Sequence, residues 1–197
     1  MNFYLILYFF AIIFLETFIP KFGKIHLTSL LHSTIVGCST NYLLLTDTKK
    51  FMNIYKYNND ELSSLYYYIP YYTLIFLFVD IKVSLEMKHK VFILHGFMMC
   101  FSTLFCIYYK LNHYLSVGLI LEVSTIFYNL MNFDSKIFKI LFGIVFLLYR
   151  NIIFASICIN YLKYYYDNEM YYEVKYNILL IQLVIFNFLN YYWEIKY

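Results

Sequence analysis

Long apolar runs recur along the whole chain, and they limit what it can fold into. A helix that crosses the hydrocarbon core of a bilayer needs about 20 largely apolar residues, because its backbone polar groups must be paired within the helix. Runs of this kind occur at residues 2–19, 26–46, 65–83, 91–109, 114–133, 137–162 and 176–193. The sequence therefore predicts an all-α membrane protein with about seven transmembrane helices.

The composition agrees with this class and excludes several functions. Of the 197 residues, 62% are hydrophobic and 14% are charged, and the mean hydropathy is +0.62, far from the values of soluble domains. The net charge of +3 is spread over short connections, so we expect no nucleic-acid partner. The sequence has no nucleotide-binding glycine motif, no HExxH and no CxxC pair, so we expect no metal site and no resident cofactor.

The connections between the runs are short, so neighbouring helices should be antiparallel and form one bundle. Residues 3–15 resemble the core of a signal peptide, but no basic segment precedes them and no small-residue cleavage site follows, so we expect a retained first span. Pro70 should kink the third helix or delay its start. A slight excess of lysine on one side weakly favours a cytosolic C-terminus and an N-terminus across the membrane.

Two charged residues stand near the middle of apolar runs, Glu122 in the fifth and Arg150 in the sixth. A charged side chain at the centre of a membrane helix costs roughly 2.5–3.5 kcal/mol on insertion. Such side chains face the interior of a bundle or a hydrated cavity, and they often mark functional sites. We therefore expect Glu122 and Arg150 to point inward.

Helical periodicity extends this expectation to other helices. At about 100° per residue, one polar stripe on the fifth helix groups Gly118, Glu122, Thr125, Asn129 and Asn132. Further stripes are Thr28, His32 and Ser39; Thr73 and Asp80; His95, Met99, Ser102 and Cys106; and Asn187, Asn190 and Glu194. The economical arrangement is that all these stripes face one shared cavity.

A structural interpretation stands beside the functional one. Membrane bundles use Ser, Thr, Asn and His to hydrogen-bond neighbouring helices, and an internal Glu with an internal Arg can be a structural ion pair. His95 is a candidate general base or nucleophile, because a neutral imidazole can accept a proton. By periodicity Ser124 points away from the stripe of Glu122, which suits helix packing better than catalysis.

Six short segments resemble those of a known family. They are Ser29–Ser33 (SLLHS), Phe78–Asp80 (FVD), Phe92–His95 (FILH), Leu121–Asn129 (LEVSTIFYN), Phe146–Arg150 (FLLYR) and Asn190–Trp193 (NYYW). In this order they resemble the TLC domain family, which includes ceramide synthases and translocating-chain-associating proteins. The resemblance covers about residues 22–197 and implies a six-helix membrane barrel around a central cavity, with residues 1–21 forming an extra transmembrane helix.

The resemblance implies a lipid-related function in the endoplasmic reticulum or another endomembrane. A membrane lipid or fatty acyl chain would occupy the cavity, and the enzymatic version would transfer an acyl group from acyl-CoA to a lipid amine. Catalysis would then involve His95, Glu122 and Asp80. Residues that would line the cavity or bind lipid are His32, Ser102, Thr125, Asn129, Arg150 and Asn190.

Two positions differ from the family pattern: Gly96 replaces a second histidine of the ceramide synthases, and Ile126 replaces a proline. Catalysis is therefore one of two versions of the lipid hypothesis, the other being lipid binding alone. A non-catalytic cargo-handling or transport-assisting role is the alternative. Ion or proton conduction through Asp80, Glu122 and His95 is a third, and it needs a hydrated path across the bilayer.

Overall fold

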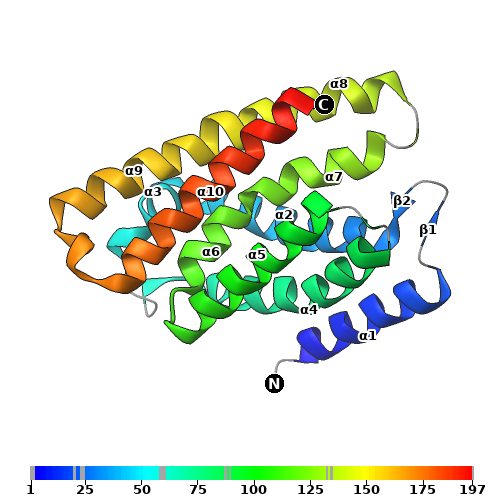
Figure 1. The fold of residues 1–197 in the computed structure, drawn as a ribbon, viewed down its shortest axis with the longest axis horizontal. Helices are drawn as coiled ribbons and strands as arrows, with labels where there is room; N and C mark the ends of the chain where they lie inside the picture. The colour runs from blue at the N-terminus through cyan, green and yellow to red at the C-terminus, as the bar shows by residue number, and fades with distance from the viewer. Residues whose placement is uncertain are drawn as a thin grey trace.

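The computed structural model describes residues 3–19, 21–22, 25–57, 61–86, 88, 90–131, 133 and 135–196, and the side chains of these residues except 21–22, 25, 190 and 193–196. The fold is all-α, apart from a pair of two-residue strands, and Figure 1 shows its helices running roughly alongside one another. The elements are α1 (Phe3–Phe18), β1 (Lys21–Phe22), β2 (Ile25–His26), α2 (Leu27–Thr46), α3 (Thr48–Met52), η1 (Ile54–Lys56), α4 (Ser64–Glu86), α5 (Lys90–Tyr108), α6 (Asn112–Gly118), η3 (Leu119–Leu121), α7 (Glu122–Met131), α8 (Lys136–Phe146), η4 (Leu147–Ile153), α9 (Phe154–Asp167), η5 (Met170–Tyr172) and α10 (Val174–Lys196).

Within the described residues, four helical stretches are long and apolar enough to cross a membrane: Ser64–Glu86, Lys90–Tyr108, Asn112–Met131 and Lys136–Asp167. Two further apolar stretches, Phe3–Phe18 and Val174–Leu189, are shorter. Helix α2 has 20 residues but is less hydrophobic than these four stretches. The predicted class of membrane protein is confirmed, whereas the count of seven spans and the barrel arrangement stay predictions.

Helix α2 packs against α1, α4 and α7. Its buried residues include Ser33, Gly37 and Thr40, which share one face. Small residues at this spacing let helix backbones approach closely in a membrane. A Cβ at Gly37 would lie 3.0 Å from the backbone nitrogen of Val123, so α2 and the start of α7 are in backbone contact at this point.

The continuous helix from α8 to α9 lies at one edge of the molecule next to α10, and α1 lies at the opposite edge beside α4 (Figure 1). Helix α8 has no buried residue. Its exposed large hydrophobic side chains are Ile137, Ile140 and Ile144. An apolar surface this extensive is stable in lipid and not in water, which agrees with a membrane location.

Pro70 lies inside α4 without delaying its start, contrary to one of the two sequence-based alternatives. Proline has no backbone N–H, so the carbonyl of Tyr66, one turn earlier, lacks its helical donor. The Ser116 hydroxyl of α6 lies 2.6 Å from this carbonyl and replaces that donor. Nearby, the side-chain amide of Asn112 donates to the carbonyl of Tyr67 at 3.2 Å. These bonds join α4 to α6.

Two long predicted helices are interrupted near their charged residues. A 3₁₀ turn, η3, separates α6 from α7 immediately before Glu122, and a π-helical segment, η4, contains Arg150. Both types of turn change which side chains share a face, and π-helical turns are frequent at functional sites. Regular periodicity therefore does not hold through these two segments.

Candidate functional site

One cavity of about 630 Å³ lies inside the bundle. Its walls come from α2, η1, η3, η4 and every helix from α4 to α10, so segments that are distant in the sequence meet around it. Most of the lining is apolar and aromatic. The lining includes the polar and charged side chains Ser29, His32, Thr73, Asp80, His95, Ser102, Glu122, Thr125, Lys139, Arg150, Asn151 and Gln182.

Glu122 begins α7, directly after the 3₁₀ turn, and its carboxylate lines the cavity. Thr125, one turn later on the same helix, also lines the cavity and lies near enough to act on this carboxylate. Arg150 and Asp80 are both near enough to act electrostatically on Glu122. The periodicity argument therefore placed Glu122 and Thr125 correctly on one inward face.

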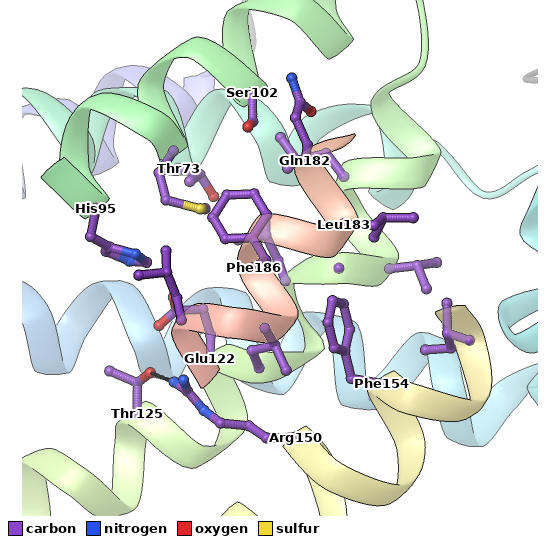
Figure 2. A pocket seen from close by; sticks show the side chains of 18 of the residues that line it. Thr73, His95, Ser102, Glu122, Thr125, Arg150, Phe154, Gln182, Leu183 and Phe186 are labelled. Carbon is purple, nitrogen blue, oxygen red and sulfur yellow. Dashed lines mark hydrogen bonds between the residues drawn. The ribbon is translucent and has the colours of Figure 1, made fainter. Parts of the chain in front are cut away.

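Arg150 reaches the cavity from the π-helical segment and contacts α7. Its Nε donates to the Ser124 hydroxyl at 2.7 Å, and its Nη2 lies 3.5 Å from the Thr125 hydroxyl (Figure 2). The guanidinium carbon lies 5.1 Å from the centre of the Phe146 ring, within range of a cation–π contact. Ser124 does not line the cavity but joins α7 to η4 through Arg150, which agrees with the expected role in helix packing.

His95 projects from α5 into the same cavity, where Phe186 of α10 meets its ring edge-on at 6.4 Å (Figure 2). Its Nδ1 is buried and has no hydrogen-bond partner among the described residues. Arg150 is near enough to act electrostatically on the imidazole. A neutral histidine in this position can accept a proton or a hydrogen bond from a ligand.

Gly96 explains why α5 and α4 lie so close together beside the site. A Cβ at Gly96 would meet Ile81 Cγ1 at 2.9 Å and Asp80 Oδ2 at 3.5 Å. A second histidine here, as in the ceramide synthases, would require at least the Ile81 side chain to move. Asp80 instead approaches the backbone of α5 and lines the cavity.

His32 lines the cavity from α2 but is only 2% exposed. Its ring stacks on Phe76 at 4.1 Å with an interplanar angle of 6°. Its Nδ1 lies 2.9 Å from the Tyr8 hydroxyl, which comes from α1. The N-terminal helix therefore fixes the orientation of a histidine in the cavity wall.

Ser102 and Gln182 line the cavity from α5 and α10 and are 1% and 6% exposed. Neither Ser102 Oγ nor Gln182 Nε2 has a hydrogen-bond partner among the described residues. Ser102 was predicted from its stripe. Gln182 was missed, although a glutamine within the apolar run ILLIQLVIF was a signal that could have found it.

Two predicted residues are not placed in the cavity. Asn129 is buried, but its side-chain amide is bonded to Ser29 Oγ at 3.2 Å and to the Thr125 carbonyl at 3.0 Å, so it links α7 to α2. The side chain of Asn190 lies outside the described residues. Within the part of the chain that the structure describes, no group of three or more His, Cys, Asp or Glu side chains could hold a metal ion.

Three tyrosines contribute to the cavity wall. Tyr55, Tyr114 and Tyr161 line it, and the ring centres of Tyr55 and Tyr114 lie 6.3 Å and 5.9 Å from that of Tyr161. Tyr55 lies in η1, outside the long apolar helices, and burial raises the pKa of its phenol, with nearby Tyr164 adding to the rise. Its hydroxyl therefore stays protonated and neutral at physiological pH.

The family comparison agrees with this architecture. The model of the TLC domain matches residues 23–197, and the chain belongs to the TLC domain family. It is an integral, multi-pass membrane protein with a lipid-related family background. No curated protein and no solved structure matches the chain. The division into an extra helix at residues 1–21 and a domain from residue 22 stays a prediction.

Proposed function

We propose that this protein binds a membrane lipid or fatty acyl chain in its central cavity and thereby influences lipid composition in the endoplasmic reticulum or another endomembrane. The observation that carries the proposal is the cavity of about 630 Å³, which combines apolar walls with one charged cluster. Lipid-sized ligands need both features, because the chain must leave water while a few polar groups fix the head.

The polar head group would lie against the charged cluster, which consists of Asp80, His95, Glu122, Thr125 and Arg150. The chain would extend along α9, because Arg150, Phe154, Ile157 and Tyr161 follow one another on the cavity side. From Arg150 to Tyr161 the helix rises about 16 Å, at about 1.5 Å for each residue. This length suits an acyl chain of medium length that ends at the tyrosines.

Acyl transfer is the catalytic version of this proposal, and the unpartnered Nδ1 of His95 supports it. His95 would accept a proton from a lipid amine while the amine nitrogen attacks the thioester carbon of acyl-CoA. The new C–N bond would form as the C–S bond breaks, and the proton would pass to the leaving thiolate. Arg150 would stabilise the oxygen anion, and Asp80 or Glu122 would orient the imidazole.

A non-catalytic cargo-handling role is the second candidate. It is supported by the hydrogen bonds that Ser124 and Asn129 make within the bundle, since these use polar groups for helix packing. In that case the cavity would be incidental, and a lipid ligand would have no effect.

The test combines cross-linking with lipid analysis in cells that express wild-type protein or His95→Ala at matched levels. His113→Ala is the control, because His113 is also buried with an unpartnered Nδ1 but does not line the cavity. We expect a photoactivatable fatty acid to label the wild type and both variants. Loss of a lipid shift in His95→Ala alone supports acyl transfer, whereas equal shifts support binding without catalysis. No labelling of the wild type would refute lipid binding.

A further inference from the structure

A second polar pair lies in the apolar half of the cavity, apart from the charged cluster. It consists of Ser102 on α5 and Gln182 on α10. Figure 2 shows both side chains on one side of the cavity and Glu122, Thr125 and Arg150 on the other, with Phe186 between the two groups. Phe154 and Leu183 border the same space.

The pair is unusual because both side chains are almost completely buried and lack partners. Ser102 Oγ and Gln182 Nε2 make no hydrogen bond to any described residue. A buried amide or hydroxyl without a partner loses its hydration without compensation, so such groups are rare. Gln182 is the only glutamine in the chain, and it interrupts the apolar run 178–186.

Another amide on the same helix shows the contrast. Asn187 bonds to the carbonyl of Leu183 at 2.8 Å and to Cys158 Sγ at 3.4 Å, so it is satisfied by the bundle. Gln182 faces the cavity instead, where only a ligand or water can pair with its N–H groups. Packing therefore accounts for Asn187 but not for Gln182.

The spacing from the charged cluster defines what such a ligand must carry. His95 and Ser102 lie on one helix, seven residues apart. At about 1.5 Å for each residue, the two polar positions are separated by about 10 Å along α5. An extended acyl chain covers this distance in roughly eight carbons.

We propose that Ser102 and Gln182 form a polar subsite for an oxygen atom carried on the ligand's chain, a hydroxyl or a carbonyl about eight carbons from the head group. The Gln182 amide donates to this oxygen, and the Ser102 hydroxyl donates to it or accepts from it. The proposal rests on the proposed function and narrows it to oxygen-substituted lipids. It also explains why two polar groups stand in an apolar wall.

The test measures how well octadecanoic acid, 8-hydroxyoctadecanoic acid, 8-oxooctadecanoic acid and 15-hydroxyoctadecanoic acid displace radiolabelled octadecanoic acid from the full-length protein in nanodiscs. One hydrogen bond is worth about a three- to tenfold change in affinity. We expect the wild type to prefer an oxygen at carbon 8 by this factor over the unsubstituted acid. Comparing the 8-hydroxy acid with the 8-oxo acid shows whether the subsite prefers a hydroxyl or a carbonyl oxygen.

Gln182→Leu and Ser102→Ala should abolish the preference while octadecanoic acid still binds. Ser156→Ala is the matched control, because Ser156 is half-buried on α9, does not line the cavity and bonds to the Ile152 carbonyl one turn earlier. Removing an unpartnered amide should not lower the thermal stability of the empty protein, and Gln182→Met provides a second variant of similar volume.

Three results would overturn the subsite. They are equal binding of all four acids by the wild type, a preference for carbon 15, and a preference that survives in Gln182→Leu. Each of these leaves the proposed function standing, because octadecanoic acid still binds. If none of the acids binds the wild type, lipid binding itself fails, and the subsite fails with it.

Discussion

Arg150 is held in the wall of the cavity by hydroxyl groups of α7. Ser124 accepts a hydrogen bond from Nε at 2.7 Å, and its own hydroxyl donates to the Leu121 carbonyl at 2.7 Å. Ser124 therefore connects the guanidinium to the 3₁₀ turn that precedes Glu122. A hydrogen bond to a charged group is worth more than a neutral one, since the charge strengthens it.

Replacing Ser124 with alanine should destabilise the protein by about 1.5–3 kcal/mol, the usual value for a hydrogen bond to a charged group. The measurement is thermal unfolding of purified Ser124→Ala in nanodiscs, with Ser156→Ala as control. Because the half-buried Ser156 hydroxyl bonds to the Ile152 carbonyl one turn earlier and to no other element among the described residues, its variant should unfold like the wild type. Equal stability of the two variants would contradict the anchoring role of Ser124.

The sequence could predict Glu122 and Arg150, because a charge in an apolar run is expensive and must face inward. It could not predict that Ser124 bonds to Arg150, because this contact depends on how η4 and α7 pack against each other. Gln182 could have been predicted in the same way as Glu122, because a polar side chain within an apolar run is also costly to bury. Asn129 shows the opposite case, since it shares a face with Thr125 but is used to bind Ser29.

At the level of elements, the contact between α2 and α7 positions Glu122. A Cβ at Gly37 would lie 3.0 Å from Val123 N and 3.1 Å from the Glu122 carbonyl carbon. Both of these are backbone atoms, which cannot turn aside as the end of a side chain can. Only glycine therefore lets α2 approach the first turn of α7, and the place of Glu122 in the cavity depends on this approach.

Gly37→Ala should therefore push α2 and α7 apart and cost about 1–3 kcal/mol, the range for overpacking. Gly143→Ala on α8 is the matched control, because nothing lies within 4 Å of its Cβ and alanine favours a helix. Thermal unfolding should separate the two variants, and Gly37→Ala should also reduce labelling by the photoactivatable fatty acid. A Gly37→Ala protein as stable as Gly143→Ala would show that the two helices have room to adjust.

At the scale of the whole molecule, the sequence could predict that polar side chains from several helices share one interior. It could not predict which helices are neighbours around it. Polar stripes on separate helices indicated one shared interior, and the side chains of Asp80, His95, Glu122 and Arg150 do line one cavity. Neighbouring helices are set by packing between segments that are distant in the sequence, such as α2 and α7. The periodicity of a single helix holds no information about such contacts. The contact of Tyr8 with His32 likewise required the position of α1 in three dimensions.

The number of spans decides on which side of the membrane each terminus lies. Seven spans place the termini on opposite sides, whereas six place them on the same side. The apolar stretch Phe3–Phe18 would rise about 24 Å as a helix, compared with about 30 Å for the hydrocarbon core. A short helix can still cross if the bilayer thins locally or flanking side chains reach the interface.

Glycosylation acceptor sites fused to each terminus would count the spans in cells. We expect glycosylation of the N-terminal tag and none of the C-terminal tag, because the lysine excess favours a cytosolic C-terminus. A tag inserted in the connection at residues 58–60 provides an internal reference, since two spans separate it from the N-terminus and it should be glycosylated as well. Modification of both terminal tags, or of neither, would require an even number of spans, and the short helix α1 would then be the first candidate for a helix that does not cross the membrane.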